Sequence, residues 1–317
     1  MFSFILRRLA LIVPILFVVA LIAFGMTFVM PGGPARVILG DFATRSQVAQ
    51  MNRQFGLDKP VYVQFVVWLR KVVHGDLGSS LFLHAPVSRL IVSRMPPTLL
   101  LAFFGQLIGI LLGIPAGVIS ALRRNGWPDR LTTVFSLGSI SVPSFWLSLM
   151  MILFFGVRLR WFPVCGYRPF SEAGWSALRY LVLPAFTLGI MQSGIIARMT
   201  RSSMIEVLEQ DYIRTARAKG LPELVVIVRH ALKNALLPVT TVIGIGFGTL
   251  LCGTWIVETI FYIPGTGALT ISAILNRDFP VIQGSLIFTA IIFVVVNLFV
   301  DICYLALNPR LRKDYEK

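Results

Sequence analysis

The sequence contains few charged residues: only 14% of its 317 residues are Asp, Glu, Lys or Arg. Soluble domains usually carry about 25%. Hydrophobic residues make up 56% of the chain, and its mean hydropathy is +0.81. Because a soluble fold could not bury this much apolar surface, the composition excludes a soluble domain and indicates a protein that spans a membrane.

The chain also lacks the charge pattern of a nucleic-acid-binding protein, although its formal net charge is +15. Its basic residues interrupt apolar runs instead of forming a stripe interleaved with aromatic residues. That distribution is typical of a membrane protein whose cytoplasmic loops are basic. We therefore expect membrane lipid, and no nucleic acid, among its partners.

Motifs for catalysis and metal binding are missing from the sequence as well. No Gly-Lys pair occurs, so there is no phosphate-binding G-x-x-x-x-G-K-[ST] loop. The sequence has no H-E-x-x-H and no G-x-S-x-G segment, and its three cysteines and three histidines are scattered. We expect this chain to be no enzyme and to hold no metal or cofactor of its own.

Six apolar runs are long enough to cross a membrane. They cover residues 9–30, 99–122, 131–157, 180–197, 235–257 and 279–300. If both termini are cytoplasmic, sixteen Lys and Arg residues lie inside and five outside, leaving aside the long outer segment after the first run. The predicted fold is an all-α integral membrane protein with six transmembrane helices, divided into a first helix with a long periplasmic segment (1–98), a five-helix core with a cytoplasmic loop at about 198–234 (99–305), and a cytoplasmic tail (306–317).

Local patterns predict three features of the long outer segment. Pro31-Gly-Gly-Pro34 stops the first helix. Thr44 and Gln47 form a candidate capping box for a short helix that ends near Gly56. Residues 60–73 are apolar and aromatic but too short to cross a membrane, which favours an interfacial or buried helix.

Four glycines in the second run are spaced four residues apart, at Gly105, Gly109, Gly113 and Gly117. This spacing places them along one helical face, where they allow close packing of another helix in lipid. The alternative is the ordinary background of glycine in membrane helices. In the third run, Pro143 predicts a kink.

The most polar long stretch is the segment 211–238, which the sequence divides into two helices. Asp211 suits an N-cap or a first turn, and Gly220 suits the left-handed position after a helix end. Pro222 suits the start of a second helix, whose apolar spacing includes Leu224, Val228, Ala231 and Ala235. A short capped helix between two spans is well suited to being held by a partner; the alternative is a basic loop with no further role.

The same segment resembles a known family. DYIRTARAKG, residues 211–220, followed by RHALKNALLP, residues 229–238, resembles the cytoplasmic EAA loop of ABC importer permeases, and more narrowly that of the dipeptide/oligopeptide/nickel family. Arg214-Thr215-Ala216 stands where that loop has Glu-Ala-Ala, and the later proline of the general pattern is absent, as in the peptide branch. Other stretches that resemble this family, and its short-peptide and glutathione-type members most, are PGGPA, HGDLGSS, RNGWPDRL, VETIFYIPGTGAL and NPR.

This resemblance implies a type I ABC importer permease in a bacterial or archaeal cytoplasmic (inner) membrane. The implied partners are a second homologous permease, one or two P-loop ATPase subunits that bind ATP and Mg²⁺, and a periplasmic or lipid-anchored substrate-binding protein. The implied contact with the ATPase is made by Asp211, Tyr212, Arg214, Thr215, Ala216, Arg217, Ala218, Lys219, Gly220 and Leu221. Glu258, Phe261 and Pro264 are implied at the periplasmic mouth of the path.

The sequence leaves alternatives open. The cargo of such an importer is a short peptide, including glutathione-like ones, or else nickel or another small solute. A protein of another class, an ion-coupled secondary transporter, usually needs ionisable groups inside the membrane, and the six runs contain none at mid-span. The alternative for Glu258 is a carboxylate at the end of a span, within reach of water or headgroups.

Overall fold

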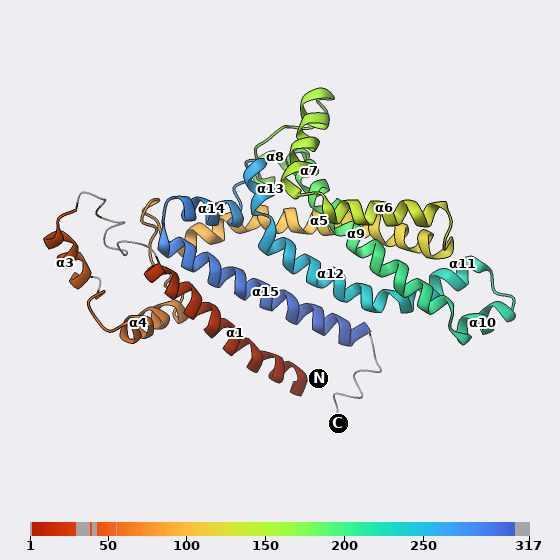
Figure 1. The fold of residues 1–317 in the computed structure, drawn as a ribbon, viewed down its shortest axis with the longest axis horizontal. Helices are drawn as coiled ribbons and strands as arrows, with labels where there is room; N and C mark the ends of the chain where they lie inside the picture. Colours follow the sequence, from red (N-terminus) through yellow and green to blue (C-terminus); the bar gives the residue numbers. More distant parts are fainter. Residues whose placement is uncertain (1, 30–38, 40–42, 55, 308–317) are drawn as a thin grey trace. The chain divides into compact units, whose positions relative to one another are not determined.

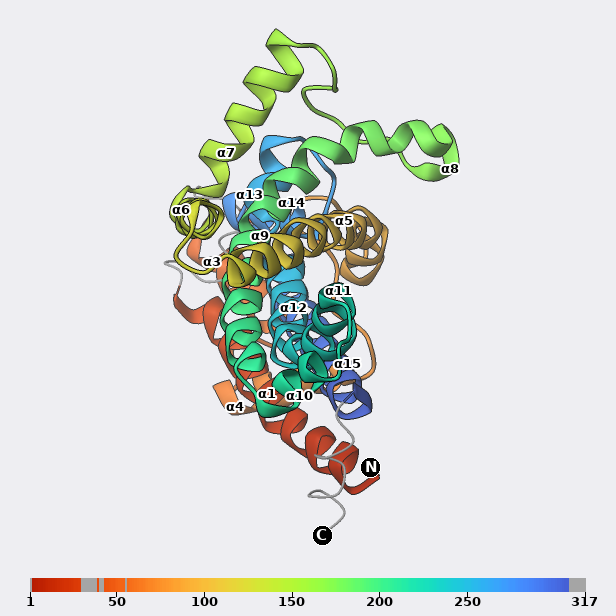
Figure 2. The ribbon, with the colours of Figure 1, turned by 90° about the vertical axis from the view of Figure 1, so that its right-hand side faces the viewer.

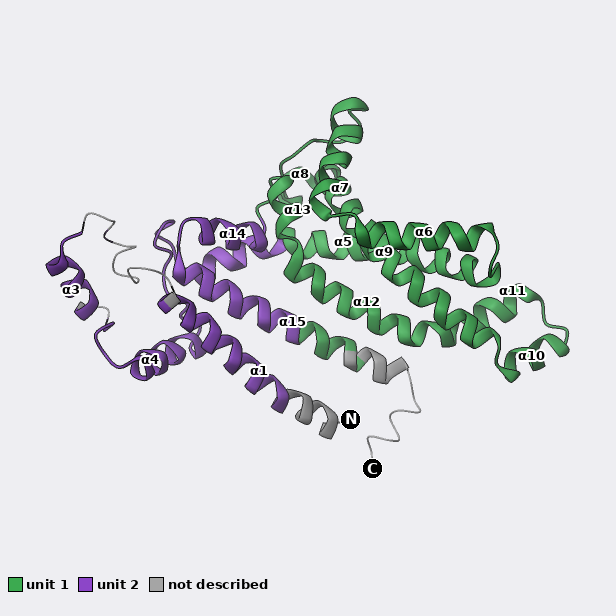
Figure 3. Ribbon diagram, viewed as in Figure 1, with its two compact units in different colours: residues 1, 97–264, 295–317 green, residues 2–96, 265–294 purple. Residues whose placement is uncertain are grey.

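The computed structural model describes residues 2–29, 39, 43–54 and 56–307, which are almost entirely helical (Figure 1). The predicted helix stop at Pro31–Pro34 and residues 308–317 of the predicted tail lie outside the described residues. The chain divides into two compact units (Figure 3). Unit 1 contains residues 97–264 and the chain from residue 295, and unit 2 contains residues 2–96 and 265–294.

Unit 2 contains the N-terminal helices and the helices that follow residue 265. Its elements are α1 (Phe2–Val29), α3 (Arg45–Gln54), α4 (Val61–Val73), the start of α5 (Val87–Leu122), α14 (Thr266–Leu275) and the larger part of α15 (Phe279–Leu307). The Phe24 ring on α1 lies 5.3 Å from that of Phe65 and 5.6 Å from that of Trp68, both on α4. No residue of α4 is buried, so the buried alternative for this helix is wrong within this chain.

Polar contacts fix the loops of unit 2. The predicted capping box is confirmed, since the Thr44 amide donates to Gln47 Oε1 at 2.9 Å and the Gln47 amide donates to Thr44 Oγ1 at 3.4 Å. Asp278 is buried and accepts a hydrogen bond from the Ser80 hydroxyl. It also accepts from the amides of Leu81 and Phe82, the two residues that follow Ser80. One carboxylate therefore holds a turn that is distant from it in sequence.

Unit 1 contains the remaining helices. They are the rest of α5, α6 (Trp127–Ser141), α7 (Ser144–Met151), the π-helical η1 (Ile152–Arg158), α8 (Phe170–Ala173), the 3₁₀ turn η2 (Gly174–Ala177), α9 (Leu178–Leu208), α10 (Asp211–Ala218), α11 (Glu223–Val225), the π-helical η3 (Val226–Leu232), α12 (Lys233–Gly253), α13 (Trp255–Ile260) and the end of α15. Helix α9 is central to this unit, because α6, α7 and α12 all pack against it.

The third predicted span is broken and not merely kinked. Helix α6 ends at Ser141 and α7 begins at Ser144, and the two axes differ by 104°; Figures 1 and 2 both show α7 leaving the direction of α6. Val142 is extended, as expected for the residue before a proline, and Pro143 has no amide to continue the helical ladder. The described residues thus contain five continuous apolar spans, or six when this bent pair counts as one.

The four glycines of α5 lie where α9 comes closest. A Cβ atom added at Gly109 would lie 2.8 Å from the Cβ of Gln192, and one at Gly117 would lie 2.6 Å from the carbonyl oxygen of Ala197. Side chains at these positions would therefore push the two helices apart. The corresponding neighbours of Gly105 and Gly113 are Leu188 and Ile196, also on α9.

Candidate functional site

Helix α10 begins and ends as local chemistry requires. Gln210 is its N-cap residue, which places Asp211 in the first turn, where a carboxylate favours the helix dipole. Gly220 has the predicted left-handed backbone, with φ +74°, and its amide donates to the carbonyl of Arg217 at 2.9 Å. Pro222 is the N-cap of α11, one position before its predicted place.

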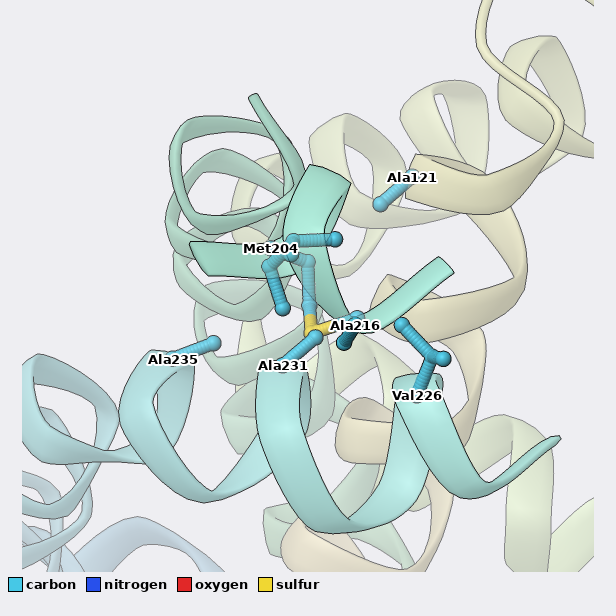
Figure 4. Close-up of a cluster of buried hydrophobic side chains, with 7 residues drawn as sticks. Ala121, Met204, Ala216, Val226, Ala231 and Ala235 are labelled. Carbon is cyan, nitrogen blue, oxygen red and sulfur yellow. The ribbon is translucent and has the colours of Figure 1, made fainter. Parts of the chain in front are cut away.

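One face of α10 is buried in a group of seven apolar side chains, four of them alanines, that we call the alanine cluster. Figure 4 shows Met204 of α9 directed toward Ala216 of α10 and Ala231 of η3. Because alanine side chains are small, α10 and η3 pack closely at Ala216 and Ala231. The alanine cluster consists of Ala121, Met204, Ile213, Ala216, Val226, Ala231 and Ala235.

The other face of α10 is open. Ala216 is buried, whereas Ala218, two residues further on, is exposed, so two alanines that look alike in the sequence have different surroundings. The remaining residues of the predicted ATPase contact are exposed as well: Asp211, Tyr212, Arg214, Thr215, Arg217, Lys219, Gly220 and Leu221. The structure therefore brings the predicted residues together on one short helix and its C-terminal turn.

The helix after Pro222 does not keep the predicted apolar face. Val226, Ala231 and Ala235 are buried, whereas Leu224 is 72% exposed and Val228 is 53% exposed. The cause is the π-helical geometry of residues 226–232, which adds residues to each turn and rotates the buried face. The prediction that these apolar residues share one face is therefore wrong.

Polar contacts also connect α10 to neighbouring elements, in addition to the apolar contacts of the alanine cluster. Arg217 donates from Nη2 and Nε to the two carboxylate oxygens of Glu223, at 2.7 and 3.1 Å, and this hydrogen-bonded carboxylate raises the pKa of the arginine. Asn234 on α12 donates to the hydroxyl of Tyr212 at 2.9 Å. The two ends of the polar segment are thus connected across the Gly220 turn.

Sequence patterns do not indicate an ion pair near this loop, in which the carboxylate is buried and the arginine is partly exposed. Arg201 of α9 donates to both carboxylate oxygens of Asp129, from Nε at 2.6 Å and from Nη2 at 2.8 Å. The Ser120 hydroxyl and the Asn125 amide donate to the same carboxylate at 2.6 and 2.9 Å. The ion pair joins α6 to α9, and the hydrogen bond from Ser120 adds α5. The signal in the sequence for a held carboxylate is that Asp129 directly follows Pro128, in the first turn of a helix.

At the other end of α12, Glu258 lies in α13 with an exposed fraction of 0%. Its Oε1 accepts hydrogen bonds from the hydroxyls of Thr98 at 2.7 Å and Thr254 at 2.8 Å. The alternative that water or headgroups reach this carboxylate is therefore wrong in this chain. Phe261 is also buried and Pro264 is exposed; their place on a transport path stays a prediction.

The sequence matches a described family over nearly its whole length. Residues 113–313 match the binding-protein-dependent transport system inner membrane component, and residues 1–102 match the N-terminal membrane component of such systems. The chain is 44% identical over 314 residues to a protein of Brucella abortus (strain 2308) whose name describes a peptide transport system permease, with 99% of this chain and 100% of that protein covered. It is 39% identical over 312 residues to the glutathione transport system permease protein GsiC of Escherichia coli (strain K12), with 98% and 99% covered.

A solved structure has a similar backbone. It is the MetNI methionine ABC transporter in an inward-facing conformation, with a TM-score of 0.58 and 20% sequence identity. The similarity covers 69% of this chain and 96% of that one. At this level of identity the likeness shows a shared fold.

Proposed function

We propose a function for this chain on one premise: it belongs to the family of binding-protein-dependent transport system inner membrane components. The family and the type I ABC importer permease fold predicted from the sequence are both confirmed. The chain is thus a multi-pass permease component of an ABC importer in the inner membrane.

The cargo we propose is a short peptide, with glutathione-like peptides included. The support is the identity of 44% and 39% to relatives named for peptide and glutathione transport, each aligned over nearly the whole chain. Apolar runs without a charged residue at mid-span fit a path that does not hold its cargo tightly. Selection would then be made mainly by the substrate-binding protein.

The observation that carries the proposed mechanism is the position of α10. Its buried face packs in the alanine cluster with residues of α5, α9, η3 and α12, while its other face is open. A partner that pushes on the open face would move these helices together, because a closely packed apolar cluster transmits displacement. Helix α12 is 21 residues long, about 31 Å at 1.5 Å per residue, and it leads from the cluster toward α13.

The partner we assign to this face is a P-loop ATPase subunit. ATP and Mg²⁺ would be bound by that subunit, and their hydrolysis would supply the energy. A second, homologous permease would complete the path, and a periplasmic or lipid-anchored binding protein would deliver the cargo to it. Arg217 is paired with Glu223, and Arg214 with Asp211 at 3.5 Å. Lys219 would therefore present uncompensated positive charge to the ATPase.

The test is reconstitution of the complex that co-purifies with the tagged chain in mild detergent. We expect a P-loop ATPase and a second permease in the complex, and ATP-dependent uptake of a labelled dipeptide or of glutathione into liposomes when the matching binding protein is added. An ionophore that collapses the proton gradient should leave this uptake unchanged. Uptake by the purified chain alone, driven by an ion gradient, would refute the proposal, and ATP-dependent uptake of Ni²⁺ without peptide uptake would refute the cargo assignment.

A further inference from the structure

The segment from the end of η1 to the start of α9 is basic, although it is predicted to lie on the outer side of the membrane. Residues 158–180 contain four arginines, Arg158, Arg160, Arg168 and Arg179, and a single acid, Glu172. The bias toward basic residues inside does not account for arginines in an outer segment. Their location in the structure indicates a reason.

Three of these arginines line one cavity of about 440 Å³ within unit 1. The cavity is open to the surface, and the three arginine side chains are exposed. Such a volume suits a small polar group of the size of a lipid headgroup. The lining residues that matter here are Arg160, Trp161, Phe162, Arg168, Arg179 and Tyr180.

The walls of this arginine pocket are held in place by the chain itself. The Gly166 amide donates to the carbonyl of Phe261 at 2.8 Å, which anchors the loop to the end of α13. The Arg168 guanidinium lies 5.9 Å from the centre of the Tyr180 ring. Arg160 has a left-handed backbone, with φ +53°, which is costly for a residue other than glycine and persists only where its surroundings fix it. The backbone of the loop is therefore fixed, and Arg168 is placed beside Tyr180, before any ligand binds.

The positive charge of the pocket is not balanced locally. Among the residues that the structure describes, no carboxylate forms an ion pair with Arg160, Arg168 or Arg179, and no acid lines the cavity. Three guanidinium groups around one space repel each other, and an anion between them would offset that repulsion. The planar donor fork of arginine matches the oxygens of phosphate or carboxylate.

The surroundings of the pocket distinguish between sources of such an anion. The pocket lies between the end of the apolar η1 at Arg158 and the start of the apolar α9 at Leu178. Trp161 is 57% exposed and Trp175 is 84% exposed. Exposed tryptophans beside arginines at the ends of apolar helices are typical of the headgroup level of a bilayer.

We propose that the arginine pocket binds the phosphate of an anionic phospholipid headgroup in the outer leaflet. The guanidinium groups of Arg160, Arg168 and Arg179 hold the phosphate oxygens, and Trp161 and Tyr180 pack against the glycerol part. Nothing in this inference requires a particular cargo, so the permease function stands whether or not the pocket binds lipid.

The test is native mass spectrometry of the full chain in detergent, titrated with phosphatidylglycerol or with zwitterionic phosphatidylcholine. We compare the unmodified chain with a triple variant, Arg160→Gln, Arg168→Gln and Arg179→Gln. A matched control removes three exposed arginines from other predicted outer positions, with Arg45→Gln, Arg53→Gln and Arg277→Gln. Size-exclusion profiles and melting temperatures establish that all three proteins are folded.

We expect the unmodified chain and the control to retain phosphatidylglycerol in preference to phosphatidylcholine. The pocket variant should bind it at least tenfold more weakly, since a single hydrogen-bonded charge pair usually contributes about a factor of ten. Equal retention by the pocket variant and the control would overturn the proposal. Displacement of the lipid by a few millimolar inorganic phosphate would overturn the lipid assignment and indicate a site for free phosphate. If the pocket variant does not fold, Arg168→Gln alone replaces it, and unchanged retention by that variant overturns the proposal.

Discussion

The two ends of α12 are held by different chemistry. One end continues from η3, against which α10 packs, and the other leads into α13. At one end, α10 is held by apolar contacts with Met204 and alanines, and the ion pair between Arg217 and Glu223 is exposed. At the other end, α13 is held by a buried carboxylate, Glu258, which accepts hydrogen bonds from two threonine hydroxyls.

This difference indicates how each end responds to force. Apolar contacts between small side chains depend on shape and have no preferred direction, so the alanine cluster can be displaced as a body while it stays packed. Hydrogen bonds to a buried carboxylate are directional, and losing one leaves a polar group unsatisfied. We therefore expect the α10 end to be sensitive to side-chain volume and the α13 end to be sensitive to loss of charge and hydrogen bonds.

The largest effect is expected from Glu258→Ala. The substitution leaves the buried hydroxyls of Thr98 and Thr254 without their acceptor and opens a cavity, at a cost of about 3 kcal/mol. The melting temperature of the purified chain in detergent should fall by roughly 6 °C. The matched control is Glu206→Ala, which removes an exposed carboxylate from α9 and should leave the melting temperature nearly unchanged. Equal melting temperatures for both variants would show that the α13 end is not held by this carboxylate.

The second-largest effect is expected from a larger side chain in α10, at the end of α12 where the alanine cluster lies. Ala216→Leu inserts three carbon atoms into the alanine cluster and should destabilise the packing of α10 by about 1–3 kcal/mol. In the reconstituted complex, this variant should hydrolyse ATP with little uptake of cargo, because α10 no longer fits its neighbours. Ala218→Leu, two residues away on the exposed face, is the matched control for side-chain size.

The ratio of cargo transported to ATP hydrolysed separates the two variants. We expect this ratio to fall for Ala216→Leu and to stay near that of the unmodified complex for Ala218→Leu. If Ala216→Leu transports normally while Ala218→Leu does not, the buried and open faces of α10 have been assigned the wrong roles.

Much of the helical fold could be predicted because lipid imposes simple rules. Apolar runs of sufficient length give the spans, and Pro143 gives the position of the bend in the third span. The proline does not predict that the span breaks by 104°. Proline lowers the preference of the preceding residue for a helix, but the size of the resulting bend depends on contacts of α6 and α7 with α9, which no local pattern reports.

The candidate site was predicted only as far as local chemistry reaches. Asp211 and Gly220 mark the ends of α10 through capping preferences, and both lie where these preferences place them. The burial of Val226 in place of Val228 follows from a π-helical turn, for which the sequence offers no recognised pattern. The pair of Asp129 and Arg201 is 72 residues apart in sequence, so only the packing of α6 on α9 brings it together.

The smallest effect is expected from the ion pair between Arg217 and Glu223, even though its shortest distance is only 2.7 Å. Both side chains are about half exposed, so water and salt screen the attraction, and holding two long side chains in one geometry costs entropy. Arg217→Ala, Glu223→Ala and the double variant should each melt within about 1 °C of the unmodified chain, at low and at high salt. A double-mutant cycle on the melting temperatures isolates the coupling between the two residues. A large coupling that disappears at high salt would mean that charge, and not the alanine cluster, holds α10 in place, and the contrast between the two ends of α12 would no longer hold.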